Sequence, residues 1–345
     1  MQDNIKAYSH KELRKLMEGL GLGAYRGDQI FKWLWQKGVT DFSSMTDIAK
    51  TWREKLSQRF SIEGLSLVKR VVARDKSQKF LFQTADDEYL ESVFIPELRR
   101  QTVCVSSQIG CPLGCRFCAT ALIPFRRNLA GYEIAEQIQI IKRYAETKVT
   151  NVVYMGMGEP LLNLKGLFES LEIICSSFGL GIGQRHITVS TAGIIDGITA
   201  LLNSPFKVKL AISLNFVDED MRAEMMPVTR KNRLKELLKL ARRYSYEKHW
   251  VTFEYVLIQG INDSLKDARR LLRLIRDIPS KINLIPYNPH PRLQFKPPAQ
   301  KQITQFYQYL LSSPHTVVLR KSRGKEILAG CGQLALDLTG AKNLL

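Results

Sequence analysis

The chain has 345 residues, 45% of them hydrophobic, and its 51 Lys and Arg residues against 33 Asp and Glu residues give a formal net charge of +18. The sequence has no run of about 18 uncharged apolar residues, which a membrane span requires, and no apolar signal-peptide core near its N-terminus. We therefore expect a cytoplasmic protein without membrane contact, large enough for one α/β domain with an added module, whose positive charge favours nucleic acid as a partner.

The first segment, residues 1–62, predicts a small helical domain. Ser9 and Glu12 have the spacing of a capping box and precede apolar residues that share one helical face. The segments 27–37 and 46–60 indicate two more helices. For this compact accessory domain our hypothesis is a role in docking an RNA substrate.

Three tryptophans stand in this first segment, at Trp33, Trp35 and Trp52. Exposed tryptophans can stack on nucleic-acid bases. Aromatic side chains more often fill a core, however, because each of them buries a large apolar area when it packs. Core anchors are therefore the favoured interpretation of all three.

From residue 63 to 100 the hydrophobic pattern changes to a period of two, which predicts a β-rich extension. Strands are expected at 65–75, 78–84 and 89–95, with a further one at 102–107. Glu91 alternates in step with Val93 and Ile95, so its carboxylate points to the same side as two apolar side chains. From this pattern alone, an ordinary surface carboxylate on a solvent-facing edge is the favoured interpretation of Glu91.

Through residues 101–345 the predicted strands and helices alternate. Strands are expected at 150–155, 186–190, 207–214, 251–257, 281–285 and 316–319. Helices are expected at 132–147, 164–178, 194–202, 233–246, 265–278 and 300–311. Strands separated by helices predict right-handed βαβ units and a parallel sheet. About six such units indicate an α/β fold with an open or partial (β/α) barrel, whose sites lie at the carboxyl ends of the strands.

Three cysteines follow one another in a C-x3-C-x2-C spacing, at Cys111, Cys115 and Cys118. Thiolates favour iron–sulfur clusters or zinc, and an ordinary cluster or a structural zinc site needs four protein ligands. No fourth ligand stands nearby, so a cluster held by these thiols would leave one iron open to a ligand that is not protein. The spacing resembles that of the radical SAM superfamily. Packing cysteines or a zinc knuckle are the alternatives.

Polar segments directly after predicted strands supply further candidates. In Gly156-Met157-Gly158-Glu159-Pro160 the glycines allow a ligand to approach the backbone and the carboxylate can accept from an ammonium group, although a simple turn is the alternative. Hydroxyl and amide groups suited to a ribose and an adenine stand at or just past strand ends, at Ser190, at Ser213, Leu214 and Asn215, and at Asn288.

Three cysteines remain outside the cluster motif. Cys331 stands between Gly330 and Gly332, which predicts an exposed and mobile thiol with a function. Together with Cys104 it could form a redox pair. Cys175 lies in an apolar helical segment, where a buried structural thiol is the simplest interpretation.

Taken together, these motifs resemble the RlmN/Cfr family of radical SAM RNA methyltransferases. The similarity covers about residues 91–336 and includes CVSSQIGCPLGCRFCAT, VVYMGMGEPLLN, AISLN, INLIPYNP and ILAGCGQL. The resemblance implies one [4Fe–4S] cluster on Cys111, Cys115 and Cys118 and two S-adenosylmethionine (SAM) molecules per turnover. It implies SAM contacts at Gly158, Glu159, Ser190, Ser213, Leu214, Asn215 and Asn288. The family commonly has His where this chain has Asn215, so that side-chain contact is an open question.

The same resemblance implies roles for the remaining residues. Cys331 would carry a methyl group, Cys104 would resolve a transient protein–RNA crosslink, and Glu91 would accept a proton, which replaces the surface interpretation of that carboxylate. The implied reaction is methylation of adenosine C2 in 23S rRNA, tRNA or both. Pro160 and Asn163 look closer to the C2-methylating branch than to the C8-methylating one.

The resemblance also implies partners. These are RNA, an external electron donor of flavodoxin or ferredoxin type, and a dithiol reductant; we expect a monomer. Two other functions stay open: C8 methylation of rRNA, and a nonenzymatic iron–sulfur or zinc protein that binds RNA. The second alternative gives no purpose to the GMGEP segment or to Cys331.

Overall fold

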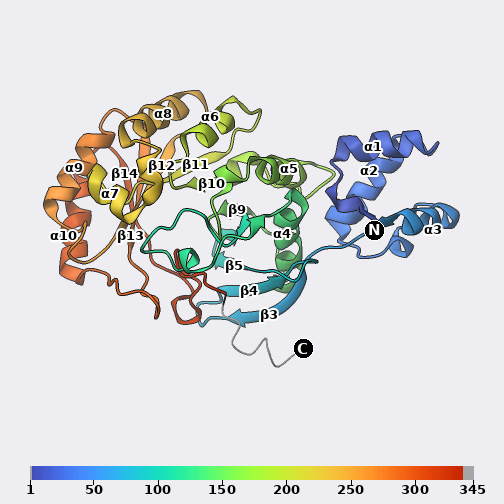
Figure 1. Ribbon diagram of the computed structural model, residues 1–345, viewed down its shortest axis with the longest axis horizontal. Coiled ribbons are helices and arrows are strands. Elements are labelled where there is room, and N and C mark those ends of the chain that lie inside the picture. The colour runs from blue at the N-terminus through green and yellow to red at the C-terminus, as the bar shows by residue number, and fades with distance from the viewer. Residues whose placement is uncertain (1, 337–345) are drawn as a thin grey trace.

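The computed structural model describes residues 2–336 and contains one ten-stranded sheet with a group of N-terminal helices at its side (Figure 1). The strand order is β14-β13-β12-β11-β10-β9-β6-β5-β4-β3. All neighbours from β6 to β14 are parallel, whereas β3, β4 and β5 continue the sheet in antiparallel pairing. The parallel part is the predicted radical SAM type of partial barrel, and β3 and β14 are the two edges of the sheet.

The parallel strands and their helices fall close to the predicted ranges. The parallel strands are β6 Arg100–Cys104, β9 Asn151–Tyr154, β10 Ile187–Thr191, β11 Lys209–Ser213, β12 Val251–Leu257, β13 Ser280–Pro286 and β14 Thr316–Leu319. The helices are α4 Gly131–Ala145, α5 Leu164–Cys175, α6 Ile195–Asn203, α7 Glu219–Met225, α8 Leu234–Glu247, α9 Leu265–Ile275 and α10 Gln300–Leu311. Of these, the seven-residue α7 was not predicted.

The predicted β-rich extension consists of β3 Ser66–Val72, β4 Gln78–Gln83 and β5 Tyr89–Glu97. These strands are not separate from the barrel, since β5 pairs with β6 and Val93 lies opposite Cys104. The extension therefore lengthens the barrel sheet beyond its first parallel strand. Of the predicted segment 101–345, positions 337–345 lie outside the described residues.

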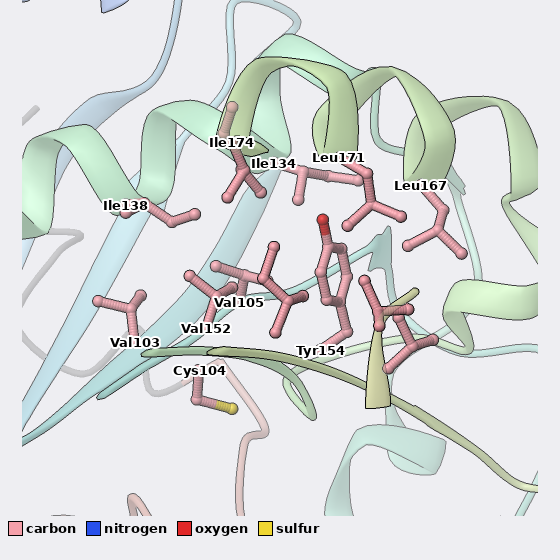
Figure 2. Packing of buried hydrophobic residues seen from close by; sticks show 14 of the residues in the cluster. Val103, Cys104, Val105, Ile134, Ile138, Val152, Tyr154, Leu167, Leu171 and Ile174 are labelled. Carbon is pink, nitrogen blue, oxygen red and sulfur yellow. The ribbon is translucent and has the colours of Figure 1, made fainter. Parts of the chain in front are cut away.

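The core beneath α4 and α5 explains the direction of one functional side chain (Figure 2). Val103 and Val105 of the β6 segment pack toward the apolar faces of these helices and are almost completely buried. Successive side chains of a strand point to opposite faces. Cys104, which stands between the two valines, therefore points away from the helices and toward the barrel interior, as Figure 2 shows.

The N-terminal helices are α1 His10–Gly19, α2 Tyr25–Lys32 and α3 Lys50–Arg59. The predicted capping box at the start of α1 is confirmed. Trp33 and Trp35 belong to a single π-helical turn after α2 and are 9% and 1% exposed, so they are core residues as predicted. Trp52 is only partly buried.

Helix α4 anchors this accessory domain to the barrel through buried polar contacts. Lys6 Nζ lies 2.6 Å from Glu136 Oε1, and the other carboxylate oxygen accepts from the backbone N–H of Leu65 at 2.8 Å. Gln139 Nε2 donates to the carbonyl oxygens of Leu34 and Trp35 at 2.6 and 3.0 Å. Both side chains of the ion pair are buried, so the pair fixes the domain in one position on α4.

Within residues 2–336, the helices are all too short or too polar to serve as a membrane span.

Candidate active site

A hollow of about 160 Å³ opens at the carboxyl ends of the parallel strands. Most of the predicted site residues line it, namely Cys111, Cys115, Cys118, Gly158, Glu159, Ser190, Ser213, Asn215 and Cys331. Leu214, Asn288, Cys104 and Glu91 are not part of its lining. Residues from five different strand ends and two loops thus converge at one place, as the partial barrel predicts.

The three clustered thiols lie in the loop after the short strand β7 Gln108–Ile109. Gly110 opens this loop with φ +72°, and a Cβ at that position would lie 2.2 Å from the carbonyl oxygen of Pro124, so only glycine fits. Burial raises the pKa of Cys111 to about 12. The pKa of Cys115 is also raised, first by burial and then by the neighbouring thiols Cys118 and Cys111.

The three thiols have donor chemistry that suits an iron–sulfur cluster. Thiolates are soft ligands that favour iron–sulfur clusters or zinc, and all three line one shared hollow. Across residues 2–336, no three Cys, His, Asp or Glu side chains are arranged around a single metal position.

Glu159 is buried beside the thiols, and burial raises the pKa of its carboxyl to about 7. One carboxylate oxygen accepts from the backbone N–H of Ala192 at 2.8 Å and the other from that of Leu161 at 3.1 Å. The carboxyl group also lines the hollow, so it can accept from an ammonium ion there. Gly158 before it has φ +94°, and a Cβ there would lie 2.5 Å from the Gln108 side chain.

Ser190 at the end of β10 donates its hydroxyl to Glu254 Oε2 at 3.1 Å. Glu254 is buried on β12 and also lines the hollow, and its Oε1 has no hydrogen-bond partner. Burial raises the pKa of this carboxyl. Sequence reasoning missed Glu254, although a carboxylate in the middle of the apolar strand VTFEYVL was a usable signal.

The segment after β11 is held by its own hydrogen bonds. Asn215 has φ +55°, a left-handed conformation that asparagine tolerates well. Its side-chain oxygen accepts from the backbone N–H of Val256 at 3.0 Å, and its backbone oxygen accepts from Asn262 Nδ2 at 2.7 Å. The Asn215 amide therefore ties β11 to β12 as well as lining the hollow.

Arg222 on α7 is fully buried and joins the loops that follow β10 and β11. Its guanidinium donates to the carbonyl oxygens of Ala192 and Leu214 at 2.7 and 3.1 Å. Burial lowers its pKa to about 10, which still leaves the group charged at neutral pH. Arg222 was missed because α7 itself was not predicted. Leu214 thus serves the site through its backbone, while its side chain is buried.

The Cys331 loop lies against the cysteine-cluster loop. The backbone N–H of Ala119 donates to Gly332 O at 2.8 Å, and Thr120 Oγ1 donates to Leu334 O at 2.8 Å. From the end of β13, Asn288 Nδ2 donates to Cys331 O at 3.2 Å. These bonds bring Cys331 into the lining of the hollow that the three clustered thiols share, with Cys118 as its neighbour among them.

Cys104 and Cys331 come close together although they are far apart in the sequence. Both are free thiols; the residue Cys104 is buried, whereas the residue Cys331 is exposed, as its flanking glycines predicted, although its sulfur faces the walls of the hollow. Burial raises the pKa of Cys104, and the neighbouring Cys331 raises it further. Burial by the walls of the hollow also raises the pKa of Cys331. Cys175 is half-buried in α5 and does not line this hollow.

Glu91 is buried rather than solvent-facing, so the interpretation from its pattern alone was wrong. It is 1% exposed because β4 and the segment after Cys331 cover it. Glu91 Oε1 lies 3.0 Å from Lys79 Nζ, and Oε2 accepts from the backbone N–H groups of Ala335 and Leu336 at 3.1 and 3.2 Å. Glu91 is therefore linked to the site through the segment that follows Cys331.

Comparisons with known proteins agree with this architecture. Residues 105–272 match the radical SAM superfamily, and residues 3–62 match the ribosomal RNA large subunit methyltransferase N-terminal domain. The chain is similar to the dual-specificity RNA methyltransferase RlmN of Geobacter sulfurreducens, with 44% identity over 98% of this chain and 94% of that protein. It is also 44% identical to the probable dual-specificity RNA methyltransferase RlmN of Aquifex aeolicus, over 96% of each chain.

A solved structure has the same fold over nearly the whole length. The crystal structure of a radical SAM methyltransferase from Sphaerobacter thermophilus superposes with a TM-score of 0.92 at 38% identity. The superposition covers 96% of this chain and 99% of that one. The accessory helices, the extended sheet and the partial barrel are therefore arranged alike in both proteins.

Proposed function

The chain belongs to the RlmN family of radical SAM RNA methyltransferases, and on that premise we propose that it methylates C2 of an adenosine in 23S rRNA, in tRNA or in both. The observation that supports this most strongly is the meeting of two free thiols, Cys104 and Cys331, beside a hollow lined by three more. A single-step methyltransferase has no need of such a pair. An aromatic C–H is neither acidic nor nucleophilic enough for direct transfer from a sulfonium.

Membership of the superfamily implies a [4Fe–4S] cluster and SAM. In this proposal Cys111, Cys115 and Cys118 hold the cluster, and Glu159 accepts from the amino group of SAM. Glu159 suits that role because it is buried and already oriented by two backbone amides. When bound, the cluster and SAM supply the carbon-centred radical that removes one hydrogen atom from a methyl group.

Cys331 carries that methyl group. Its thiolate attacks the methyl carbon of a first SAM, so a new carbon–sulfur bond forms, the methyl–sulfonium bond breaks and S-adenosylhomocysteine leaves. The contacts of Gly332 and Leu334 with the cluster loop hold the resulting S-methyl group at the hollow. After loss of one hydrogen atom, the carbon adds to adenine C2 and joins RNA to protein through a methylene bridge. This adduct must give up one electron, and the oxidised cluster would be the acceptor when bound.

Glu91 and Cys104 complete the reaction. Glu91 accepts the proton from the ring carbon, and Lys79 Nζ lies 3.0 Å from its Oε1. The Cys104 thiolate then attacks the Cys331 sulfur; the sulfur–carbon bond breaks, the product carbon takes a proton, and a disulfide remains. An external dithiol reduces that disulfide, and a flavodoxin or ferredoxin supplies electrons to the cluster.

Entry of RNA requires one rearrangement in this scheme. Glu91 does not line the hollow, and both carboxylate oxygens already have partners. The segment 335–336 must therefore release Glu91 before it can reach the flipped adenine. Residues 2–62, which lie beside α4 and extend away from the barrel (Figure 1), are our candidate for docking the RNA.

Mass spectrometry of nucleosides tests the proposal. Cluster-loaded protein is incubated anaerobically with SAM, a reductant and either 23S rRNA or tRNA, and the digested RNA is analysed. We expect 2-methyladenosine. Finding 8-methyladenosine would assign the chain to the C8 branch, and SAM cleavage without modified RNA of either type would contradict the proposed function.

A further inference from the structure

A second hollowed surface lies at the amino ends of the parallel strands, opposite the thiols. We call it the basal surface, and its defining residues are Arg185, Lys207, Lys209, His249, Trp250 and Lys281. They stand before or at the start of β10, β11, β12 and β13. The basal surface is therefore built from four neighbouring strands of the sheet and not from one loop.

The basal surface consists of two adjoining hollows. The larger, of about 780 Å³, is lined in part by the basic residues Lys142, Lys148, Arg185, His186 and Lys207. The smaller, of about 180 Å³, is lined by Lys209, His249, Trp250, Thr252 and Lys281. Lys207 lines the larger hollow and Lys209 the smaller one, and only one residue separates them at the start of β11. The two hollows therefore form one continuous basic surface.

The cations of this surface have no acidic partners. The ion pairs of residues 2–336 include none of Arg185, Lys207, Lys209 or Lys281. The pKa of Lys209 is lowered by burial and then by the like charges of Lys281 and Arg100. By contrast, Arg127 is already paired with Asp86 and Glu133. Uncompensated charge of one sign favours a polyanionic ligand.

Trp250 adds an aromatic platform to this charge. It is 57% exposed, whereas Trp33 and Trp35 are buried in the accessory domain. A single exposed apolar side chain is ordinary, but this indole stands in a hollow with Lys209 and Lys281. Cationic grooves with aromatic side chains are the usual means of holding single-stranded nucleic acid, since cations contact phosphates and rings stack on bases.

The basal surface is separate from the active site. The strand β12 runs from one to the other: Trp250 stands before its first residue, and Glu254, the first β12 residue that lines the active-site hollow, lies roughly 13 Å further along the strand. A ligand at Trp250 therefore contacts neither SAM nor the clustered thiols. The same separation argues against an electron-donor protein, because such a partner must dock close to the cluster.

We infer that the basal surface binds a segment of the substrate RNA remote from the target adenosine, with phosphates on Lys207, Lys209 and Lys281 and an unpaired base on Trp250. The inference rests on the proposed RNA substrate. It assigns to the barrel a second RNA contact, on the side away from the reacting base. Long, folded RNA can reach both ends of the barrel, while a short stem-loop can fill only the active site.

Binding measurements with variants of the intact, cluster-loaded protein test this inference. We expect Trp250→Ala to weaken binding of full-length tRNA or an rRNA domain about tenfold, with Trp250→Phe restoring most of it. The double variant Lys207→Glu, Lys281→Glu should weaken binding at least as much. It should also reduce the slope of log affinity against log salt by about 0.7 to 0.9 for each lost phosphate contact.

The matched control is Lys266→Glu, Arg269→Glu, which changes the net charge equally at two exposed positions of α9. We expect the control to bind long RNA within about twofold of the unchanged protein, because it keeps the basal cations. A short stem-loop carrying only the target adenosine should bind all variants alike. Equal losses in both double variants, or equal losses for the short RNA, would overturn the inference.

Two readouts separate this inference from the proposed function. SAM cleavage and methylation of Cys331 need no RNA, and both should be unchanged in the basal variants. If the unchanged protein binds long RNA through Trp250 but methylates none, the proposed function fails and the inference stands. If it methylates RNA and the basal variants bind like the unchanged protein, the inference fails alone. A loss confined to reduction by an acidic donor protein would also contradict it.

Discussion

Two buried polar clusters of this protein differ in what they leave unpaired. On α4, Lys6, Glu136 and Gln139 join the accessory domain to the barrel, and their charged and amide groups have protein partners. At the mouth of the barrel, Glu254 Oε1 and the Asn288 side-chain oxygen are buried without partners. Buried polar groups are normally hydrogen-bonded. The first cluster is therefore a structural joint, while the second leaves two buried acceptor oxygens free.

The largest expected effect is at the mouth of the barrel and comes from replacing the clustered thiols. Changing Cys111, Cys115 or Cys118 to alanine should abolish iron binding and SAM cleavage, since two thiolates do not hold the cluster. Iron content and anaerobic SAM cleavage are the measurements. Cys175→Ala is the matched control, because that half-buried thiol lies in α5 and does not line the site. Full iron content in any cluster variant would refute the assignment of these ligands.

Variants of Cys331 and Cys104 should stop the reaction at different steps. Cys331→Ala removes the methyl carrier, so unmodified RNA and no covalent adduct are expected. Cys104→Ala blocks only the last step, so protein crosslinked to RNA through Cys331 should accumulate. A denaturing gel after turnover compares the two directly. Crosslinked RNA with Cys331→Ala, or none with Cys104→Ala, would mean that the roles are wrongly assigned.

At the structural joint the expected effect is on stability. Glu136→Ala leaves the Lys6 ammonium buried and unpaired, which should lower the free energy of unfolding by about 3–5 kcal/mol. Urea unfolding followed by tryptophan fluorescence measures it, because Trp33 and Trp35 lie in the accessory domain. The control Glu54→Ala breaks only the exposed pair with Lys50 and should cost less than about 1 kcal/mol. Similar costs for both would remove the distinction between the joint and the surface.

The smallest change in stability is expected from replacing Glu254 at the mouth of the barrel. Glu254→Gln keeps the shape and can keep the contact with Ser190, so the free energy of unfolding should change by less than about 1 kcal/mol. The affinity for SAM should fall about tenfold, since the carboxyl group with its free Oε1 is replaced by an amide. Equilibrium dialysis with cluster-loaded protein checks this, with Glu236→Gln on the exposed face of α8 as control. An unchanged affinity would show that the unpaired oxygen does not face SAM.

Much of the fold followed from the sequence because long apolar periods repeat through the barrel. The alternation of strands and helices was sufficient to place the partial barrel and the site at the carboxyl ends of its strands. Helix α7 was missed because seven residues hold only two turns, too few for a 3.6-residue period to stand out. Arg222 lies on this helix and was therefore missed as well. Its role depends on loops that meet only in the folded chain.

Glu91 shows the other limit of sequence reasoning. A period of two tells which residues share a face of a strand, but not what covers that face. Here the cover comes from Lys79 on β4 and from residues 335–336, which are far away in the chain. The resemblance of motifs corrected the interpretation where periodicity did not.

The hydrogen bond between Ala119 and Gly332 has a consequence for how the enzyme matures. Ala119 directly follows Cys118, so the loop proposed to bind the cluster is joined to the loop proposed to carry the methyl group. Any shift of the first loop during cluster assembly would therefore be passed directly to Cys331.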